Sequence, residues 1–84
     1  MDEFLSTTQL GWLLGRSPGA VRRMIRDGEV ESVRMPSGYR VRRDEALRVS
    51  RDWLEKESGR NLSDRDVERL AEEVLARNAQ ITES

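Results

Sequence analysis

The sequence contains no cysteine and no histidine. Disulfide bonds, thiolate or imidazole metal sites, cysteine nucleophiles and histidine-dependent catalytic triads are therefore excluded. Long apolar runs are also absent: stretches such as Trp12–Leu14 fall far short of the roughly 20 residues that a membrane-spanning helix needs. The acidic start Met1–Glu3 is unlike a signal peptide. We expect a cytoplasmic protein that makes no contact with a membrane.

The chain has 84 residues, enough for one small domain, because a chain of this size buries only about 60% of the surface that its unfolded form exposes. Charged residues make up 37% of the sequence and apolar residues 36%, which favours a compact domain with a thin core over disorder. Because so small a domain has no room for an enclosed site, we expect no enzymatic activity, cofactor, metal or small-molecule ligand.

Positive and negative charges are separated along the sequence, although the net charge is only −1. Residues 15–43 contain eight arginines and three acids, whereas residues 52–84 contain five basic and nine acidic residues. This segregation indicates a localised anionic partner for the middle of the chain and a second surface of different purpose at its end. Arginine supplies 14 of the 15 basic residues. The composition of a GC-rich genome explains that preference as well as binding to an anionic partner does.

Capping signals predict a first helix from about Thr7 to Gly15. Ser6 and Gln9 have the spacing of a capping box, in which the serine hydroxyl accepts from the Gln9 amide and the glutamine side chain reaches back. Gly15 is expected to end the helix because glycine readily takes the left-handed conformation. The apolar positions of this helix are Leu10, Leu13 and Leu14.

A second helix is predicted from Pro18 to Asp27, with Ser17 as its N-cap and proline at its first position. Only the three residues Gly15–Ser17 separate it from the first helix. A connection this short that contains glycine is typical of a helix-turn-helix.

A β-hairpin and a third helix are predicted next. Residues 30–34 and 39–41 are β-prone and flank a Pro/Ser/Gly turn, so they form a candidate wing. The third helix opens at Arg43–Glu45, where acids suit the helix dipole, and ends near Ser58–Gly59. The inward stripe of the third helix is Ala46, Leu47, Ser50, Trp53 and Leu54. Trp12 and Trp53 are expected to pack in the core, with stacking on a base as the alternative.

A fourth, amphipathic helix is predicted over residues 63–80, with Ser63 as its N-cap. Residues 59–62 form a short connector before it, and residues 81–84 are expected to fray. Two interpretations of the helix are open: its apolar stripe caps the domain, or it forms a protein–protein contact. The residues available for such a contact are Val67, Leu70, Val74 and Leu75.

The second helix has two opposed faces on a helical wheel, one apolar around Val21 and one basic. The basic face suits the major groove of DNA, where arginine bonds guanine or grips phosphate. A merely solvated face is the simpler alternative, which the neighbouring turn and hairpin disfavour. The candidate DNA contacts of this helix are Ser17, Gly19, Arg22, Arg23 and Arg26.

The hairpin tip offers charge, a hydroxyl group, backbone N–H groups and an aromatic ring, which suit phosphate or the minor groove. Packing of Tyr39 on Arg34 across the hairpin is an equal alternative for the tyrosine. The candidate DNA contacts of the hairpin are Arg34, Ser37, Gly38, Tyr39 and Arg40. Further candidate phosphate contacts are Arg16, Arg42 and Arg43, the last two of which have pairing with Asp44 and Glu45 as an alternative.

Residues 4–55 resemble a winged helix-turn-helix domain of the MerR/excisionase superfamily. The resemblance rests on the short turn between the helices, on a second helix that ends at Gly28, and on Arg34–Arg40, which has the pattern Arg-x-Pro-x-Gly-aromatic-Arg. It implies a DNA-binding domain at residues 1–58 that is mainly α with a small β-hairpin, followed by one extra C-terminal amphipathic helix. It also implies that the second helix lies in the major groove of double-stranded DNA and the hairpin on the backbone or in the minor groove.

The small stand-alone members of this superfamily include excisionases, which bind and bend attachment-site DNA and assist an integrase, with several copies on neighbouring sites. The resemblance therefore implies an excisionase-like recombination directionality factor. A small transcriptional regulator, and an antitoxin or assembly adaptor that binds through its last helix, are the alternatives. The sequence does not resemble the effector domain of full MerR regulators. Gly19 and Ala20 offer few base-reading groups, so DNA shape is expected to contribute to specificity.

Overall fold

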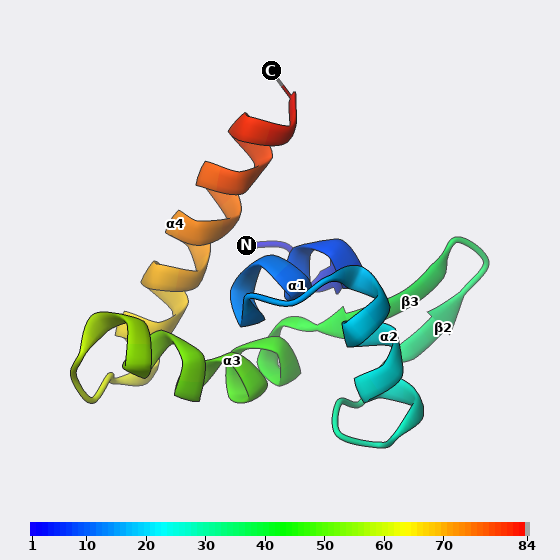
Figure 1. Cartoon of the computed structure of the whole chain (residues 1–84), viewed down its shortest axis with the longest axis horizontal. Helices are drawn as coiled ribbons and strands as arrows, with labels where there is room; N and C mark the ends of the chain where they lie inside the picture. The colour runs from blue at the N-terminus through cyan, green and yellow to red at the C-terminus, as the bar shows by residue number, and fades with distance from the viewer. Residues whose placement is uncertain (84) are drawn as a thin grey trace.

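The computed structural model describes the backbone of residues 1–83 and the side chains of residues 1–80. Within that range the chain is mainly helical, with a small antiparallel sheet, as expected. Figure 1 shows α2 and the β2–β3 hairpin at one end of the molecule and α3 with α4 towards the other. The elements are β1 (Phe4–Ser6), α1 (Thr7–Leu14), α2 (Pro18–Arg26), β2 (Val33–Met35), β3 (Gly38–Arg42), α3 (Arg43–Ser58) and α4 (Asp64–Glu83).

The sheet has three strands in the order β1-β3-β2. β2 and β3 form the predicted hairpin, in which Arg34 is opposite Tyr39. On its other edge β3 pairs with β1, so that Leu5 is opposite Val41, and both side chains are buried. The sequence analysis missed β1 because three residues are too few to show alternation, and the strand that they pair with is distant in sequence.

The helix ends follow the predicted caps. The Ser6 amide donates to Gln9 Oε1 at 2.9 Å, and the Gln9 amide donates to Ser6 Oγ at 3.1 Å, which completes the capping box of α1. Gly15 ends α1 with a φ of 64°. The Ala20 amide donates to Ser17 Oγ at 3.1 Å, which confirms the N-cap of α2. Local hydrogen bonds therefore set the short spacing between the two helices.

Gly11, inside α1, permits a close approach of the chain that joins α1 to α2. The Arg16 amide donates to the Gly11 carbonyl oxygen at 2.9 Å, and Gly11 is buried. A Cβ atom at Gly11 would lie 2.4 Å from the Arg16 carbonyl oxygen, which is too close for any side chain. The turn can therefore fold back tightly only over glycine.

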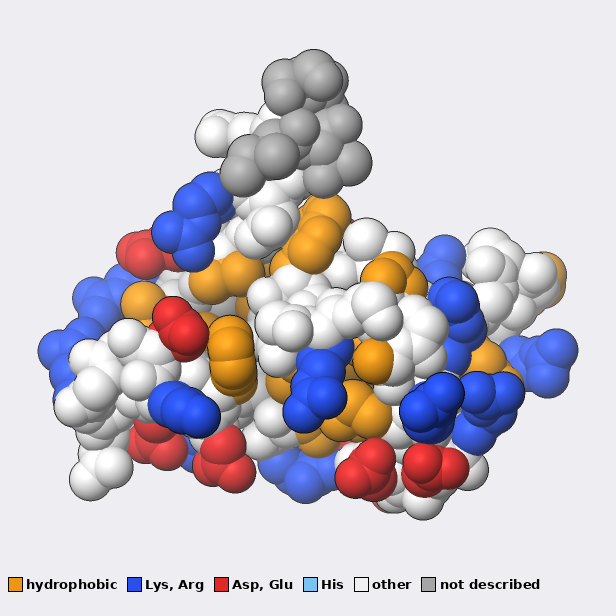
Figure 2. Space-filling model, viewed as in Figure 1, with side chains coloured by type: hydrophobic (Ala, Val, Ile, Leu, Met, Phe, Trp, Pro, Cys, Tyr) orange, Lys and Arg blue, Asp and Glu red, His pale blue; other side chains and the backbone are white. Residues whose placement is uncertain are grey.

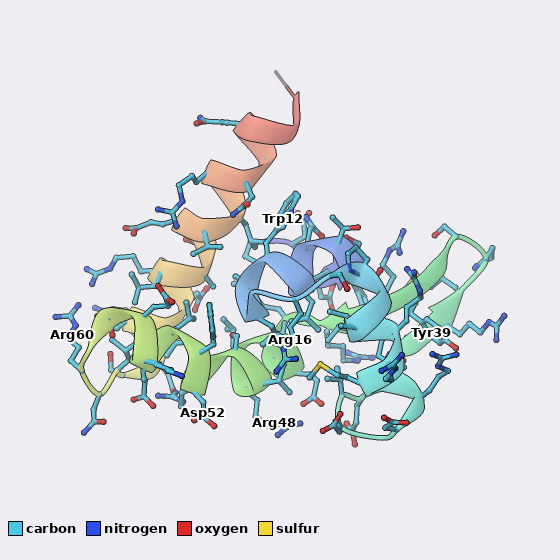
Figure 3. All side chains as sticks on the ribbon, in the orientation of Figure 1. Trp12, Arg16, Tyr39, Arg48, Asp52 and Arg60 are labelled. Atoms are coloured by element: carbon cyan, nitrogen blue, oxygen red, sulfur yellow. The ribbon has the colours of Figure 1, made fainter. Side chains whose placement is uncertain are left out.

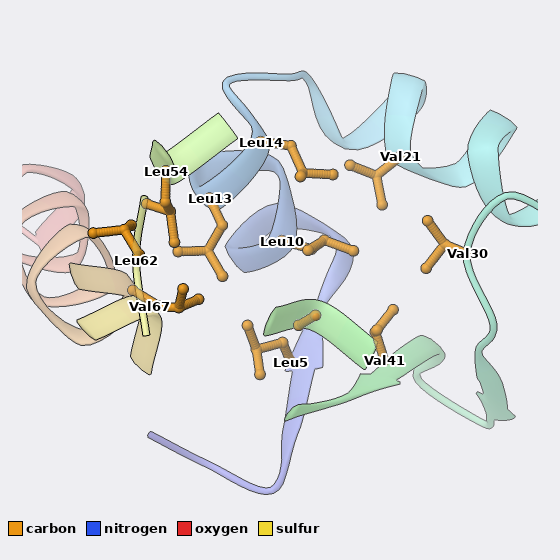
Figure 4. Close-up of a cluster of buried hydrophobic side chains, with 12 residues drawn as sticks. Leu5, Leu10, Leu13, Leu14, Val21, Val30, Val41, Leu54, Leu62 and Val67 are labelled. Atoms are coloured by element: carbon orange, nitrogen blue, oxygen red, sulfur yellow. The ribbon is translucent and has the colours of Figure 1, made fainter. Parts of the chain in front are cut away.

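One hydrophobic core receives side chains from every element except β2, which is held by its pairing with β3 (Figure 4). The side chains of Leu10 and Leu13 in α1 lie at its centre and are fully buried. Val21 from α2 and Val30 from the following loop close it on one side, and Leu54 and Val67 close it on the other. The same core thus fixes α2, the hairpin and the first part of α4 relative to α1.

The connector between α3 and α4 is held by side chains of α3. The Leu62 amide donates to Glu55 Oε2 at 2.8 Å, while Arg51 donates to the Leu62 carbonyl oxygen and to Asp64. Leu62 itself is buried in the core. The predicted N-cap of α4 is confirmed, because the Asp66 amide donates to Ser63 Oγ at 3.2 Å.

Three expectations about packing and helix ends need correction. Trp53 was expected in the core, but 36% of its surface is exposed because it covers the outer side of Gly15. Trp12 and Leu47 are half-buried rather than buried. The backbone of α4 stays helical to Glu83, past the predicted end at residue 80, whereas Ser84 lies outside the described residues.

Candidate nucleic-acid interface

α2 presents three arginines to solvent on the side that faces away from the core. Val21 is fully buried, and Met24 and Ile25 pack against the core as half-buried side chains. On the opposite side Arg22, Arg23 and Arg26 are all exposed. The predicted division of this helix into an apolar and a basic face is therefore confirmed.

Gly19 leaves the start of this basic face open. A Cβ atom there would meet nothing closer than Arg22 Nη2 at 3.8 Å and Ser17 Oγ at 3.9 Å, so packing does not require glycine. Glycine is also a poor helix former, which weakens α2 at this position. An exposed glycine with no packing role lets a ligand approach the backbone closely. Ser17 is likewise exposed, although its hydroxyl is engaged in the N-cap.

An open depression of about 660 Å³ runs beside this face. Arg16 and Arg23 line it together with Ser17 and Gly19, and Asp27 and Glu29 also contribute to its lining. The structure therefore places the predicted contact Arg16 beside the predicted contacts of α2. Since carboxylates repel phosphates, Asp27 and Glu29 mark the limit of the surface that suits an anion.

The hairpin tip is ordered by its own side chains. Arg40 donates through Nη1 to the Tyr39 carbonyl oxygen at 2.9 Å and through Nη2 to Ser37 Oγ at 3.0 Å. The guanidinium carbon of Arg34 lies 5.7 Å from the centroid of the Tyr39 ring, a cation–π contact. The predicted packing of Tyr39 on Arg34 is therefore confirmed. Gly38 has a φ of 120°, a conformation that other residues rarely adopt.

The wing candidates divide between the two faces of the hairpin. Side chains alternate along a strand, so Tyr39 shares a face with the buried Val41, and Arg34, its cross-strand partner, shares that face too. Arg40 and Arg42 lie on the opposite face. The candidate contacts of the hairpin therefore lie close together in the register but project from both of its faces. Arg34 and Tyr39 thus share the strand face of the buried Val41, although the Arg34 side chain itself is exposed.

Arg42 and Arg43 do not pair with the acids that follow them. The guanidinium carbon of Arg42 lies 5.4 Å from the Phe4 ring centroid, and among the described side chains neither arginine forms an ion pair with Asp44 or Glu45. The Arg43 amide donates to the Glu3 carbonyl oxygen at 2.8 Å, which ties the start of α3 to the N-terminal segment. The acids at the start of α3 therefore hold neither of these two guanidinium groups.

Glu45 holds the loop between α2 and the hairpin, a role that sequence reasoning missed. Its Oε2 accepts from the Glu31 amide at 2.8 Å, and Arg48 donates to both carboxylate oxygens, at 2.6 and 2.8 Å. Only 12% of the Glu45 side chain is exposed. The hydrogen bonds from Arg48, followed by that from Glu31, lower the pKa of this carboxyl below its ordinary value. The only feature of the sequence that could have indicated this role is the position of Glu45 in the first turn of α3.

Basic side chains gather over the end of the molecule that holds α2 and the hairpin, with acidic side chains along its lower edge (Figure 2). Further along the same view the two signs are mixed. Tyr39 lies at this basic end, while Arg16 lies closer to the middle of the molecule (Figure 3). The guanidinium groups gathered on this surface suit the binding of a polyanion.

Of the predicted partner contacts in α4, one lies inside the domain and three are half-buried at its surface. Val67 is 1% exposed, and Leu70, Val74 and Leu75 are partly buried against the core. The Met1 amine also pairs with Glu72 at 3.0 Å. Of the two open interpretations, capping of the domain therefore holds for Val67, which no partner can reach.

Within the described part of the chain, no helix is both long and apolar enough to cross a bilayer, and no cluster of acidic side chains has the arrangement of a metal site. Scans against models of protein families, curated proteins and solved structures find no match to this chain.

Proposed function

We propose that this chain is a winged helix-turn-helix protein that binds double-stranded DNA without catalysis. In this proposal α2 enters the major groove, and the β2–β3 hairpin acts as the wing along the backbone or in the minor groove. The observation that carries the proposal is the exposed face of α2, where Arg22, Arg23 and Arg26 project opposite the buried Val21. B-form DNA admits an α-helix in its major groove, where arginine bonds guanine or phosphate.

Three features of the fold support this geometry. Gly11 and Gly15 allow a three-residue turn between α1 and α2, the spacing of a helix-turn-helix. The shared core fixes the hairpin at the same end of the molecule as α2. The contact between Glu45 and the Glu31 amide holds the loop that joins these two elements. Because the two elements are held before DNA arrives, little ordering is required on binding.

The residues of the basic face suit a recognition of the DNA sequence that combines arginine contacts to bases with the shape of the DNA. The exposed face of α2 carries no asparagine or glutamine to recognise adenine, and near the start of the helix Gly19 and the half-buried Ala20 offer few base-reading groups. Guanine contacts by arginine, and the width of the groove met by the hairpin, are the remaining sources of specificity. This accords with an architectural role, which we infer from the resemblance to excisionases: bending attachment-site DNA for an integrase, with several copies bound side by side.

Fluorescence anisotropy with a labelled duplex tests the binding proposal. We expect binding at low salt. The slope of the logarithm of the binding constant against the logarithm of the salt concentration should become shallower by about one for each phosphate contact removed. Replacing Arg22, Arg23 and Arg26 together by alanine should weaken binding more than tenfold, since each arginine contact is worth about 1–3 kcal/mol. Arg65→Ala, in the exposed first turn of α4, is the matched control and should change the affinity less than twofold. Equal loss in the control and in the α2 variant contradicts the proposal.

A bending assay separates the architectural role from simple regulation. A small transcriptional regulator of this fold would use the same contacts, so the binding data alone do not distinguish the two. We expect the excisionase-like factor to bend attachment-site DNA and to promote excision by an integrase. Binding without bending would favour the regulator. If the protein does not retard the duplex in a gel at low salt, both proposals are wrong.

A further inference from the structure

α1, α3 and α4 enclose an open groove of about 320 Å³ that contains both tryptophans of the chain. Trp12 comes from α1 and Trp53 from α3, while Leu70 and Val74 of α4 line the opposite wall. Figure 3 shows Trp12 in the angle between α1 and α4. We call this surface the tryptophan groove. It shares no residue with the basic face of α2 or with the hairpin.

The exposure of these two indoles is costly for so small a domain. The buried core of the described residues consists of leucine, valine and alanine and contains no aromatic side chain. Trp12 is only half-buried, and Trp53 is 36% exposed. Large apolar side chains that remain at the surface, and tryptophan above all, are enriched where proteins meet their partners. The two largest apolar side chains of the chain thus leave part of their surface in contact with solvent.

The rim of the groove is predominantly negative. Glu57 and Glu73 line it, and α3 ends beside it at Ser58, so the carbonyl end of the helix adds partial negative charge. Arg77 is the one basic residue in the lining among the described side chains. A cationic group is therefore favoured at this rim, and it would also gain from the faces of the indole rings. An acidic occupant would face two carboxylates and a helix C-terminus.

We propose that the tryptophan groove binds a segment of a protein partner in which an apolar side chain is flanked by lysine or arginine. The apolar side chain inserts between the indoles and the α4 wall, and the flanking cations lie against Glu57 and Glu73. This proposal does not rest on DNA binding, because the two surfaces are separate. A chain that uses both surfaces links duplex DNA to a basic segment of a second protein.

Tryptophan fluorescence of the full chain tests the proposal directly, since both fluorophores line the groove. The probe is a synthetic amphipathic peptide of leucine and lysine, compared with the same peptide in which glutamate replaces lysine. We expect the lysine peptide to shift the emission to the blue and to saturate, and the glutamate peptide to leave it unchanged. Glu73→Lys should weaken binding about five- to tenfold, because it reverses a charge at the rim.

The matched control is Glu68→Lys, which makes the same charge change on α4 outside the groove and should alter binding less than about twofold. Equal weakening by the two reversals, or equal binding of the two peptides, overturns the proposal. An emission shift that follows protein concentration without peptide also overturns it, because a second copy would then fill the groove. Trp53→Ala provides a second test, by loss of peptide binding in calorimetry. The Glu73→Lys protein should still bind duplex DNA. The proposal of peptide binding and the proposal of DNA binding can therefore each be refuted without the other.

Discussion

The substitution Gly11→Ala tests whether the tight turn between α1 and α2 depends on glycine. A Cβ atom at position 11 would lie 2.4 Å from the Arg16 carbonyl oxygen, whereas real Cβ contacts stay above 3.0 Å. The backbone of the turn must therefore move by at least about 0.6 Å, the difference between these distances. Overpacking of this kind costs about 1–3 kcal/mol, and strain in the hydrogen bond from Arg16 to Gly11 adds about 1 kcal/mol.

The helix propensity of alanine offsets part of that cost, by about 1 kcal/mol. The expected net loss is about 1–3 kcal/mol, which lowers the Tm of a domain of this size by roughly 5–20 °C. Thermal and urea denaturation followed by circular dichroism measure both quantities. Since the turn also sets α2 against α1, duplex binding should weaken even though the arginines of α2 are unchanged. A Gly11→Ala protein as stable as the parent would refute the reasoning.

The remaining predictions concern three other positions. Gly19→Ala should keep or raise the stability, because its Cβ atom meets nothing closer than 3.8 Å. It should nevertheless weaken duplex binding measured by anisotropy, and unchanged binding would show that DNA does not approach the backbone of α2 closely at this position. Glu45→Ala should lower the unfolding free energy by about 1–2 kcal/mol at pH 7. Because the folded pKa of Glu45 is lowered, this difference should shrink in urea titrations below about pH 4.3, the ordinary glutamate pKa, and a constant difference would contradict the assignment. Val67→Ala should cost about 1–3 kcal/mol, whereas an α4 that only served a partner would tolerate it.

The helix ends could be predicted because their causes are local. The caps at Ser6, Ser17 and Gly59 are hydrogen bonds or left-handed residues within three or four positions of the helix end, whereas Arg42, the N-cap of α3, forms no such side-chain bond. The basic face of α2 was equally accessible, since it follows from helical periodicity once the bounds are known. These two kinds of information suffice for the mainly helical fold and for the exposed arginines.

The parts that sequence reasoning missed depend on contacts between distant residues. β1 forms only by pairing with β3, and Glu45 holds the loop before the hairpin through the amide of Glu31, fourteen residues away. Trp53 fits the inward stripe of α3, but the neighbouring α1 ends at Gly15, which leaves the indole at the surface. The division of the wing arginines between two faces depends on the register of the hairpin, which the turn sets and composition does not reveal.

The central claim, that α2 and the hairpin form one DNA-binding surface, is tested most directly by mapping the contact residue by residue. ¹⁵N-labelled protein is titrated with a short duplex at low salt, where even non-specific binding has a Kd of about 10⁻⁴–10⁻⁶ M or tighter. We expect the amide resonances of residues 17–26 and 34–40 to shift together, while those of the second half of α4 stay in place. Shifts centred on α4, or no shifts at all, would contradict the claim.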